Sequence, residues 1–278
     1  MKRFVPGETA EDALAEAARL ELNGFTTLLT YLGENVSNEV EASSVTRRYL
    51  DLLDMIEREG LDSHISIKLT QIGLEFDRTL CLENLHRLAS RADETGSTVW
   101  IDMESSTFTD ITLDLFQEIL NTNVHVGICL QSYLKRTADD LDALLPLSPL
   151  IRLVKGAYQE PSAIAFVSKN DVDDNFENLA LRFISSGTGK TQLALGTHDE
   201  ELIDMIIGKA SEIEDDALML EIQMLYGIGV QTQQRLLSEG QRVRVLLNFG
   251  EAWYSWYLRR LAERPANIWF VLRNIFIR

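Results

Sequence analysis

Eight short apolar runs, rich in β-branched residues and spread along the chain, constrain the fold more than any other feature of the sequence. Each is short enough to form a strand that is buried on both faces. Between the runs lie segments with apolar residues at helical spacing, such as Leu82, Leu85 and Leu88 ahead of Gly96. The runs are 25–32, 63–69, 98–103, 124–131, 150–155, 192–196, 218–224 and 242–247.

The alternation of strand-like and helix-like segments predicts an α/β fold. Parallel strands need a crossover connection each time, and eight repeats favour closure into a (β/α)₈ TIM-type barrel over an open doubly wound sheet. The chain has 278 residues, only five prolines and no linker-like shift in composition, so we expect one barrel domain over 1–278. Thr9 and Asp12 carry the spacing of a helix cap in the first segment.

Charge and composition exclude several classes of protein. The formal net charge is −17, whereas a nucleic-acid-binding protein needs a basic stripe and a lipid-docking protein needs basic patches. Two cysteines cannot build a disulfide framework, and the four histidines show no metal-ligand spacing. The start MKRFVPGETAED lacks the apolar core of a signal peptide, and no run of 18 apolar residues occurs. We therefore expect a soluble, cytoplasmic domain that binds no nucleic acid and no metal.

Polar side chains gather within or just after the strand-like runs. Ionisable groups are costly to bury there unless they are paired. In a barrel of this class the carboxyl ends of the strands and the loops that follow build the active site. A ligand site at that end is therefore favoured over a set of structural ion pairs. The residues concerned are Lys68, Asp102, Glu104, Gln131, Arg152, Lys155, Tyr158, Thr197, His198, Asp199, Glu221 and Gln223.

The C-terminal segment WYSWYLRRLAERP carries two adjacent arginines at helical spacing from an acid. One interpretation is a solvated helix face on which Glu263 pairs with Arg259 or Arg260. The other is a carboxylate clamp, because planar guanidinium groups bind a carboxylate through two parallel hydrogen bonds. On the second interpretation, a C-terminal helix closes the top of the active site.

Seven motifs occur in one order along the chain: SIKLTQIG, IDMES, GICLQSYLKRT, RLVKGAY, LGTHD, EIQMLYG and RRLAERPAN. This series resembles the strand-end motifs of the proline dehydrogenase family, in its monofunctional bacterial type, from about Phe4 to Asn267. The resemblance implies a flavin-dependent barrel that oxidises L-proline to Δ1-pyrroline-5-carboxylate by hydride transfer to FAD. It also implies a quinone electron acceptor, contact with the inner face of the membrane, and a separate pyrroline-carboxylate dehydrogenase downstream.

The resemblance also assigns roles to individual residues. Asp102 and Arg152 are implied to be catalytic, with Arg152 close to the flavin N5, where it would stabilise negative charge. The implied cofactor contacts are Met103, Gln131, Val154, Lys155, Gly156, Thr197 and His198. The implied substrate contacts are Lys68, Ala157, Tyr158, Leu225, Trp256, Arg259, Arg260 and Glu263.

Two stretches depart from the family pattern. Members usually have a YVPYG-like stretch after the eighth strand, where this chain has Leu246 to Gly250 with Asn248, and a common tyrosine is replaced by Trp256. These departures leave open a flavin dehydrogenase for a modified proline or another cyclic imino acid. A non-catalytic barrel that senses an amino acid is a third hypothesis. It is disfavoured because a mere binder need not keep Lys68, Asp102 and Arg152 together.

Overall fold

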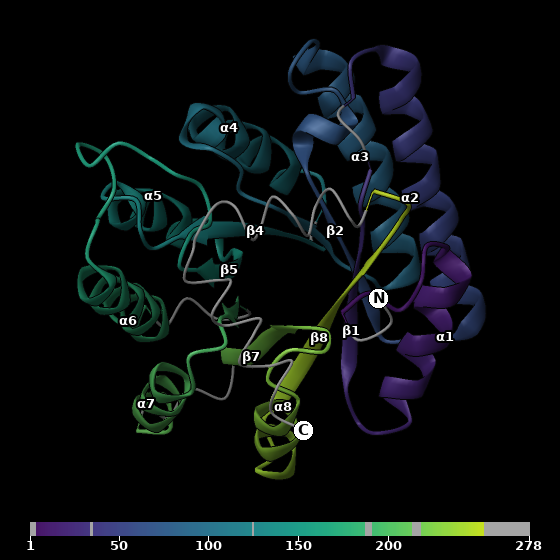
Figure 1. Ribbon diagram of the computed structural model, residues 1–278. Coiled ribbons are helices and arrows are strands. Elements are labelled where there is room, and N and C mark those ends of the chain that lie inside the picture. The colour runs from purple at the N-terminus through teal and green to yellow at the C-terminus, as the bar shows by residue number, and fades with distance from the viewer. Residues whose placement is uncertain (1–3, 34–35, 124, 187–190, 213–217, 253–278) are drawn as a thin grey trace.

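The computed structural model describes residues 4–33, 36–123, 125–186, 191–212 and 218–252. Within them, parallel strands close into a barrel in chain order, with β8 pairing to β1 (Figure 1). The predicted (β/α)₈ barrel is confirmed, and the open sheet is excluded. The strands are β1 Thr26–Tyr31, β2 Ser63–Ile67, β3 Val99–Ile101, β4 Val126–Gln131, β5 Leu150–Val154, β6 Thr191–Gly196, β7 Leu218–Leu225 and β8 Arg242–Phe249.

Helices form the outer ring around the strands (Figure 1). The expected cap of the first helix is present, since Thr9 Oγ1 accepts from the Asp12 backbone N–H and Asp12 accepts from that of Thr9. The α-helices are α1 Ala10–Glu21, α2 Glu39–Glu59, α3 Arg78–Thr95, α4 Thr109–Leu120, α5 Thr137–Leu144, α6 Lys169–Ser185, α7 Glu200–Ala210 and α8 Val230–Ser238. Short 3₁₀ helices are η1 Leu69–Ile72, η2 Ser106–Phe108 and η3 Leu145–Leu147.

Helix α1 occupies an unusual place in this ring. It precedes the first strand, yet it packs against both β1 and β8. In a regular barrel the helix that follows the eighth strand covers this part of the wall. Among the described residues, α1 covers this part of the wall, and α2 to α8 follow β1 to β7 in turn.

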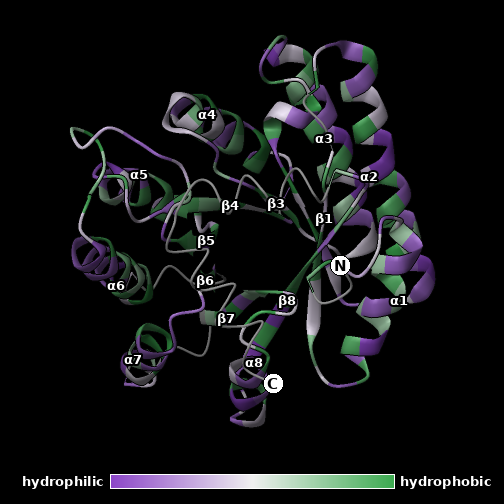
Figure 2. Ribbon diagram, viewed as in Figure 1, coloured by the Kyte–Doolittle hydropathy of each residue, from purple (hydrophilic) through white to green (hydrophobic). Residues whose placement is uncertain are grey.

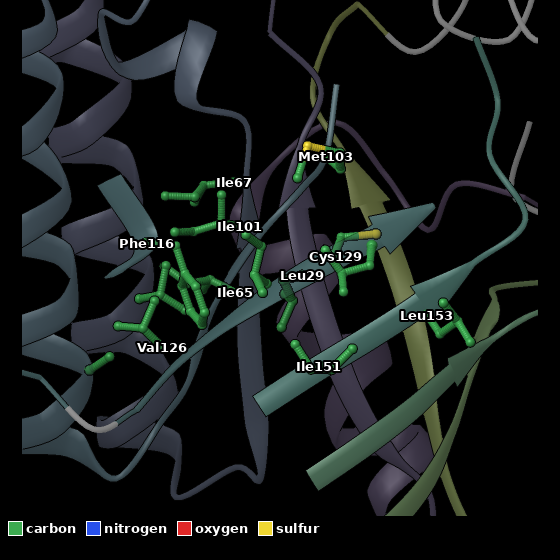
Figure 3. Close-up of a cluster of buried hydrophobic side chains, with 14 of the residues drawn as sticks. Leu29, Ile65, Ile67, Ile101, Met103, Phe116, Val126, Cys129, Ile151 and Leu153 are labelled. Atoms are coloured by element: carbon green, nitrogen blue, oxygen red, sulfur yellow. The ribbon is translucent and has the colours of Figure 1, made fainter. Parts of the chain in front are cut away.

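The outward faces of the strands are apolar and form the main core against the helices. Ile65 and Ile67 of β2, Ile101 of β3 and Val126 of β4 gather around Phe116 of α4 (Figure 3). The helices turn hydrophobic residues toward the strands and hydrophilic residues away from them (Figure 2). The layer between strands and helices is thus the ordinary apolar core of the fold.

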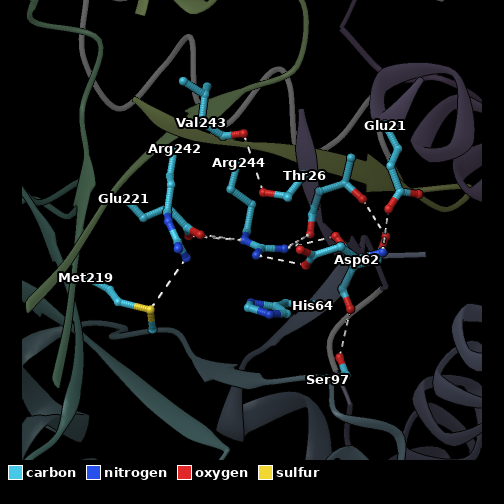
Figure 4. Close-up of polar contacts among 12 residues, drawn as sticks. Glu21, Thr26, Asp62, His64, Ser97, Met219, Glu221, Arg242, Val243 and Arg244 are labelled. Carbon is cyan, nitrogen blue, oxygen red and sulfur yellow. Dashed lines mark hydrogen bonds and ion pairs between the residues drawn. The ribbon is translucent and has the colours of Figure 1, made fainter. Parts of the chain in front are cut away.

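The inward faces of the strands are more polar than in most barrels of this class, whose interiors are filled mainly by branched apolar side chains. Strand register brings Glu221 of β7 level with Arg242, and Gln223 level with Arg244 of β8. Arg244 Nε donates to both carboxylate oxygens of Glu221, at 3.1 and 3.0 Å (Figure 4). The other end of Arg244 donates to the backbone oxygens of Thr27 and Asp62 and to Asp62 Oδ1.

We call Arg244, Glu221 and Asp62 the barrel floor, because they lie toward the amino-terminal ends of the strands. The sequence-based assignment of Glu221 to the ligand site was wrong. Glu221 is buried in the floor and does not line the main cavity. It lies four residues before the end of β7, which corresponds to about 13 Å along a strand.

Candidate active site

A cavity of about 620 Å³ opens at the carboxyl ends of the strands. Its volume is in the range of small-molecule and cofactor sites. Glu221 and Asp199, which the strand-end pattern placed in the ligand site, do not line this cavity. Every residue that the family resemblance assigns to the site and that the structure describes does lie at its wall. These residues are Lys68, Asp102, Met103, Gln131, Arg152, Val154, Lys155, Gly156, Ala157, Tyr158, Thr197, His198 and Leu225.

The strand periodicity explains this convergence. Side chains alternate between the two faces of a strand, and parallel register pairs place partners on the same face. Cys129 pairs with Arg152, and Arg152 pairs with Ala194, so these three residues point to the barrel interior together. Residues at or just after the carboxyl ends of several strands then reach the cavity wall, among them Lys68, Asp102, Gln131 and Leu225.

An ion-pair cluster forms the base of the cavity. Arg152 of β5 is 5% exposed, and its Nη2 donates to Asp102 Oδ1 and, at 3.0 Å, to Ser66 Oγ. Ser66 Oγ donates to the same Asp102 oxygen at 2.8 Å. Lys68 Nζ lies 3.9 Å from Asp102 Oδ2, and both side chains are 26% exposed. Asp102 therefore joins a buried guanidinium to an accessible ammonium group.

An aromatic ring supports the cluster from within the barrel. The guanidinium carbon of Arg152 lies 5.5 Å from the centre of the Trp100 ring, close enough for a cation–π interaction. Trp100 is fully buried, and its indole N–H donates to His64 Nδ1 at 3.2 Å. Burial lowers the pKa of His64 well below its usual value, so the ring is neutral and can accept this bond.

A second carboxylate borders the cavity beside Lys68. Glu104 accepts from the Thr70 hydroxyl at 2.7 Å and from the Thr70 backbone N–H at 3.2 Å. It is buried, and burial raises its pKa above the usual value for glutamate. The contact ties the segment after β3 to η1, the turn that directly follows Lys68.

Lys155 directly follows β5 at the cavity wall, but carboxylates hold its ammonium group. Its Nζ lies 2.5 Å from Asp173 Oδ1 of α6 and 2.7 Å from Asp199 Oδ2. Lys169 pairs with the same two aspartates. The cluster fastens α6 and the turn before α7 to the end of β5, so Lys155 has a structural contact beside its predicted cofactor contact.

His198 and Gln233 hold the backbone at the end of β7. The Leu225 N–H donates to His198 Nε2 at 3.0 Å, and the Leu225 carbonyl accepts from Gln233 Nε2 at 3.0 Å. Burial lowers the pKa of His198 to about 4, so the ring is neutral near pH 7 and able to accept. These bonds place the Leu225 side chain at the cavity wall.

Two glycines permit close packing along the strand ends. A Cβ on Gly156, which has φ +112°, would lie 2.2 Å from the Tyr133 ring, and a Cβ on Gly196 would lie 2.7 Å from Val154 Cγ1. Nearby, Gln131 Nε2 donates to the Met103 carbonyl at 3.3 Å, whereas Gln131 Oε1 has no partner among the described residues. The wall therefore presents a buried acceptor that a ligand N–H can satisfy.

Several predicted residues lie outside the described part of the chain: Trp256, Arg259, Arg260 and Glu263. The proposed clamp and the closing C-terminal helix stay predictions. Sequence reasoning also missed Ser66 and Trp100, which contact Arg152 directly. A signal for Ser66 existed, because it precedes Lys68 by two positions and so shares its face of β2.

A family model and two curated relatives that match this chain carry the name proline dehydrogenase. The proline dehydrogenase family model matches residues 13–273. Proline dehydrogenase 1 of Bacillus subtilis strain 168 is 37% identical over 274 residues, which cover 99% of this chain and 90% of that protein. Proline dehydrogenase of Deinococcus radiodurans is 38% identical over 281 residues, covering 99% of this chain and 89% of that protein.

Solved structures share the fold. Proline utilization A (PutA) from Bdellovibrio bacteriovorus superposes with a TM-score of 0.82 at 22% identity, covering 90% of this chain and 31% of that chain. PutA from Bradyrhizobium japonicum gives a TM-score of 0.75 at 21% identity, covering 90% of this chain and 29% of that chain. At these identities the likeness concerns the barrel alone.

Proposed function

The chain belongs to the proline dehydrogenase family, and on that premise we propose that it oxidises L-proline to Δ1-pyrroline-5-carboxylate with FAD. The reaction removes a hydride from C5 of proline and a proton from its nitrogen. The site must therefore anchor the substrate carboxylate and hold the redox cofactor against C5. The observation that carries the proposal is the Lys68–Asp102–Arg152 cluster at the base of the cavity.

The residues of the cavity wall fit a flavin. The ring system carries both N–H and carbonyl groups. The wall offers Gln131 Oε1, which has no partner among the described residues, as an acceptor and Arg152 as a donor. Gly156 and Gly196 carry no side chain, so the backbone at the ends of β5 and β6 packs closely against its neighbours at this wall. We propose that Met103, Gln131, Val154, Lys155, Gly156, Thr197 and His198 hold FAD. Once bound, FAD supplies the two-electron oxidant that accepts the hydride.

Lys68 is suited to hold the substrate carboxylate. Its ammonium group reaches the cavity and is only loosely paired, since 3.9 Å separates Nζ from Asp102 Oδ2. A carboxylate that enters the cavity can therefore take a direct contact with Lys68 while Asp102 keeps its bonds to Ser66 and Arg152. We propose that Ala157, Tyr158 and Leu225, which also line the cavity, form the wall around the proline ring.

The charge balance of the described site bears on the substrate's proton. Lys68 and Arg152 are offset by Asp102 and Glu104 when both acids are ionised, so this part of the site alone gives no surplus of positive charge. A surplus is what favours the neutral amine from which hydride can leave. We propose that Arg259 and Arg260 supply it while they clamp the substrate carboxylate, with Glu263 orienting them.

The proposals for the electron acceptor and the next enzyme rest on the family resemblance. We propose a membrane quinone as acceptor, reached by peripheral contact at the inner face of the membrane. We also propose a separate pyrroline-carboxylate dehydrogenase downstream. Across the described residues, no helix has the length and apolar character needed to cross a membrane.

The visible spectrum of the purified protein tests the proposal. We expect flavin bands that bleach under anaerobic conditions when L-proline is added and that return when a soluble quinone analogue is added. D-Proline is the matched control, because it has the same composition but the wrong geometry at Cα. Flavin bands that persist with L-proline but bleach with another imino acid would overturn the substrate assignment. If no imino acid bleaches the flavin bands, the protein binds flavin without oxidising an imino acid, and the proposed activity is wrong.

A further inference from the structure

A chain of hydrogen bonds leads from Arg152 through Gln223 to the barrel floor. Gln223 of β7 is 5% exposed and lines the cavity. Its Oε1 accepts from Arg152 Nη1 at 3.4 Å, and its Nε2 donates to Glu221 Oε1 at 2.8 Å. Gln223 thus links the ion-pair cluster of the cavity to the barrel floor.

The chemistry of its two neighbours determines the orientation of the Gln223 amide. An ionised carboxylate only accepts hydrogen bonds, and a guanidinium group only donates them. The amide nitrogen must therefore face Glu221, and the amide oxygen must face Arg152. Flipping the amide would lose both bonds and bring an N–H group against a guanidinium group.

The barrel floor gives this link a rigid anchor. Arg244 binds both oxygens of Glu221 and is itself held by the backbone oxygens of Thr27 and Asp62 (Figure 4). Both side chains of the Glu221–Arg244 pair are at most 5% exposed. A side chain hydrogen-bonded to such a pair has little freedom to move. Because Gln223 accepts a hydrogen bond from Arg152, it restricts the position of the guanidinium group as well.

The remaining contacts of Arg152 differ in character. Ser66 and Asp102 both bind Nη2, and Asp102 is shared with the accessible Lys68. Nη1 is held by Gln223, which carries no charge. An acid at position 223 would supply the same oxygen but would neutralise the guanidinium group. The amide holds the group in place and leaves its positive charge directed at the cavity.

We propose that Gln223 is a positioning residue for the reaction: it orients Arg152 through the hydrogen bond to Nη1 and preserves its charge. This inference rests on the proposed function, in which Arg152 faces the bound flavin. The role predicts two separable effects. Loss of the amide should slow the redox step without weakening substrate binding, because position matters most in the transition state. Replacement by an acid should change the electrostatics of the flavin itself.

The test uses the FAD-loaded protein with Gln223→Met, Gln223→Glu and a matched Gln192→Met variant. Gln192 lies on β6 with a similar exposure of 6% and does not line the cavity. In rapid-mixing experiments with proline, we expect Gln223→Met to lower the limiting rate of flavin reduction about 10- to 100-fold. Its apparent Kd for proline should stay within threefold of the wild-type value, and Gln192→Met should match wild type in both.

The midpoint potential of the bound flavin is the second readout. We expect Gln223→Glu to move it to a more negative value, because an added negative charge beside Arg152 disfavours electron uptake. If Gln223→Met fails to retain FAD, this potential decides the question. An unchanged potential in Gln223→Glu at a pH at which the carboxyl groups at positions 221 and 223 are both ionised, or a normal reduction rate in Gln223→Met, would overturn the inference. Failure of the proposed function is distinct, because then proline would not reduce the wild-type flavin.

Discussion

Removing the buried guanidinium of the barrel floor should be among the most damaging single changes in this protein. Arg244→Met leaves the Glu221 carboxylate buried at 4% exposure and takes away the Nε–H group that donates to both of its oxygens, at 3.0 and 3.1 Å. Breaking a buried pair by removing one partner costs about 3–5 kcal/mol, because the remaining charge is uncompensated. The contact with Asp62 adds little, since that side chain is 57% exposed.

The assay is urea denaturation at pH 7, followed by tryptophan fluorescence. We expect a free energy of unfolding about 3–5 kcal/mol below wild type for Arg244→Met. The double variant Arg244→Met with Glu221→Leu should recover at least half of this loss, because neither charge then stays buried.

A surface arginine provides the matched control. Arg235→Met breaks exposed pairs with Asp204 and Glu239 on a side chain that is 35% exposed, so it should cost less than about 1 kcal/mol. An Arg244→Met variant as stable as this control would refute the reasoning. So would a double variant that is as unstable as the single one.

Four further predictions concern the site. Arg152→Ala should slow flavin reduction by proline more than it weakens proline binding, and a normal reduction rate in rapid mixing would remove it from the catalytic residues. Arg259→Met and Arg260→Met should each raise the KM for proline about 30- to 1000-fold while FAD stays bound, and steady-state values within threefold of wild type would contradict the clamp. The pKa of His198 is lowered to about 4 in the fold, so the unfolded chain binds more protons from there to about pH 6.5 and stability rises with pH across that window. When the free energy of unfolding is measured at several pH values, His198→Asn should lose this part of the pH dependence. An unchanged pH profile would show that another group causes it. Leu246 lines the cavity, and Leu246→Tyr should lower kcat/KM for 4-hydroxyproline relative to proline by about 10- to 200-fold, a ratio that would stay constant if the residue did not face substrate.

The sequence alone was sufficient to predict the strands. Each apolar run was recovered, with ends that differ by a few residues at most. The largest shortening is at β3, predicted over 98–103 and observed as Val99–Ile101. Even there the ladder continues, because the Asp102 N–H donates to the Ile67 carbonyl at 2.8 Å. The positions of the strands could be predicted because short apolar runs and the helical segments between them are visible within a few neighbouring residues.

Height within the barrel could not be predicted. A period of two tells which face a residue occupies but not how far along the strand it lies from the cavity. Glu221 and Gln223 follow the same pattern, yet one lies in the floor and the other at the cavity wall. The pairing of Lys155 with Asp173 was equally hidden, because it depends on how α6 packs against β5.

The place of α1 in the helical ring sets the order in which the molecule can be assembled on the ribosome. The hydrogen bond from Thr26 Oγ1 to the Val243 carbonyl joins residues 217 positions apart, and α1 needs the same late strand to cover its apolar face. At about 5–20 residues per second, β8 is synthesised about 10–40 s after β1. During that interval β8 is absent, so the apolar face of α1 and the edge of β1 that pairs with β8 are uncovered. Closure of the barrel is therefore the slow, non-local step of folding, and the nascent chain is most open to aggregation before it.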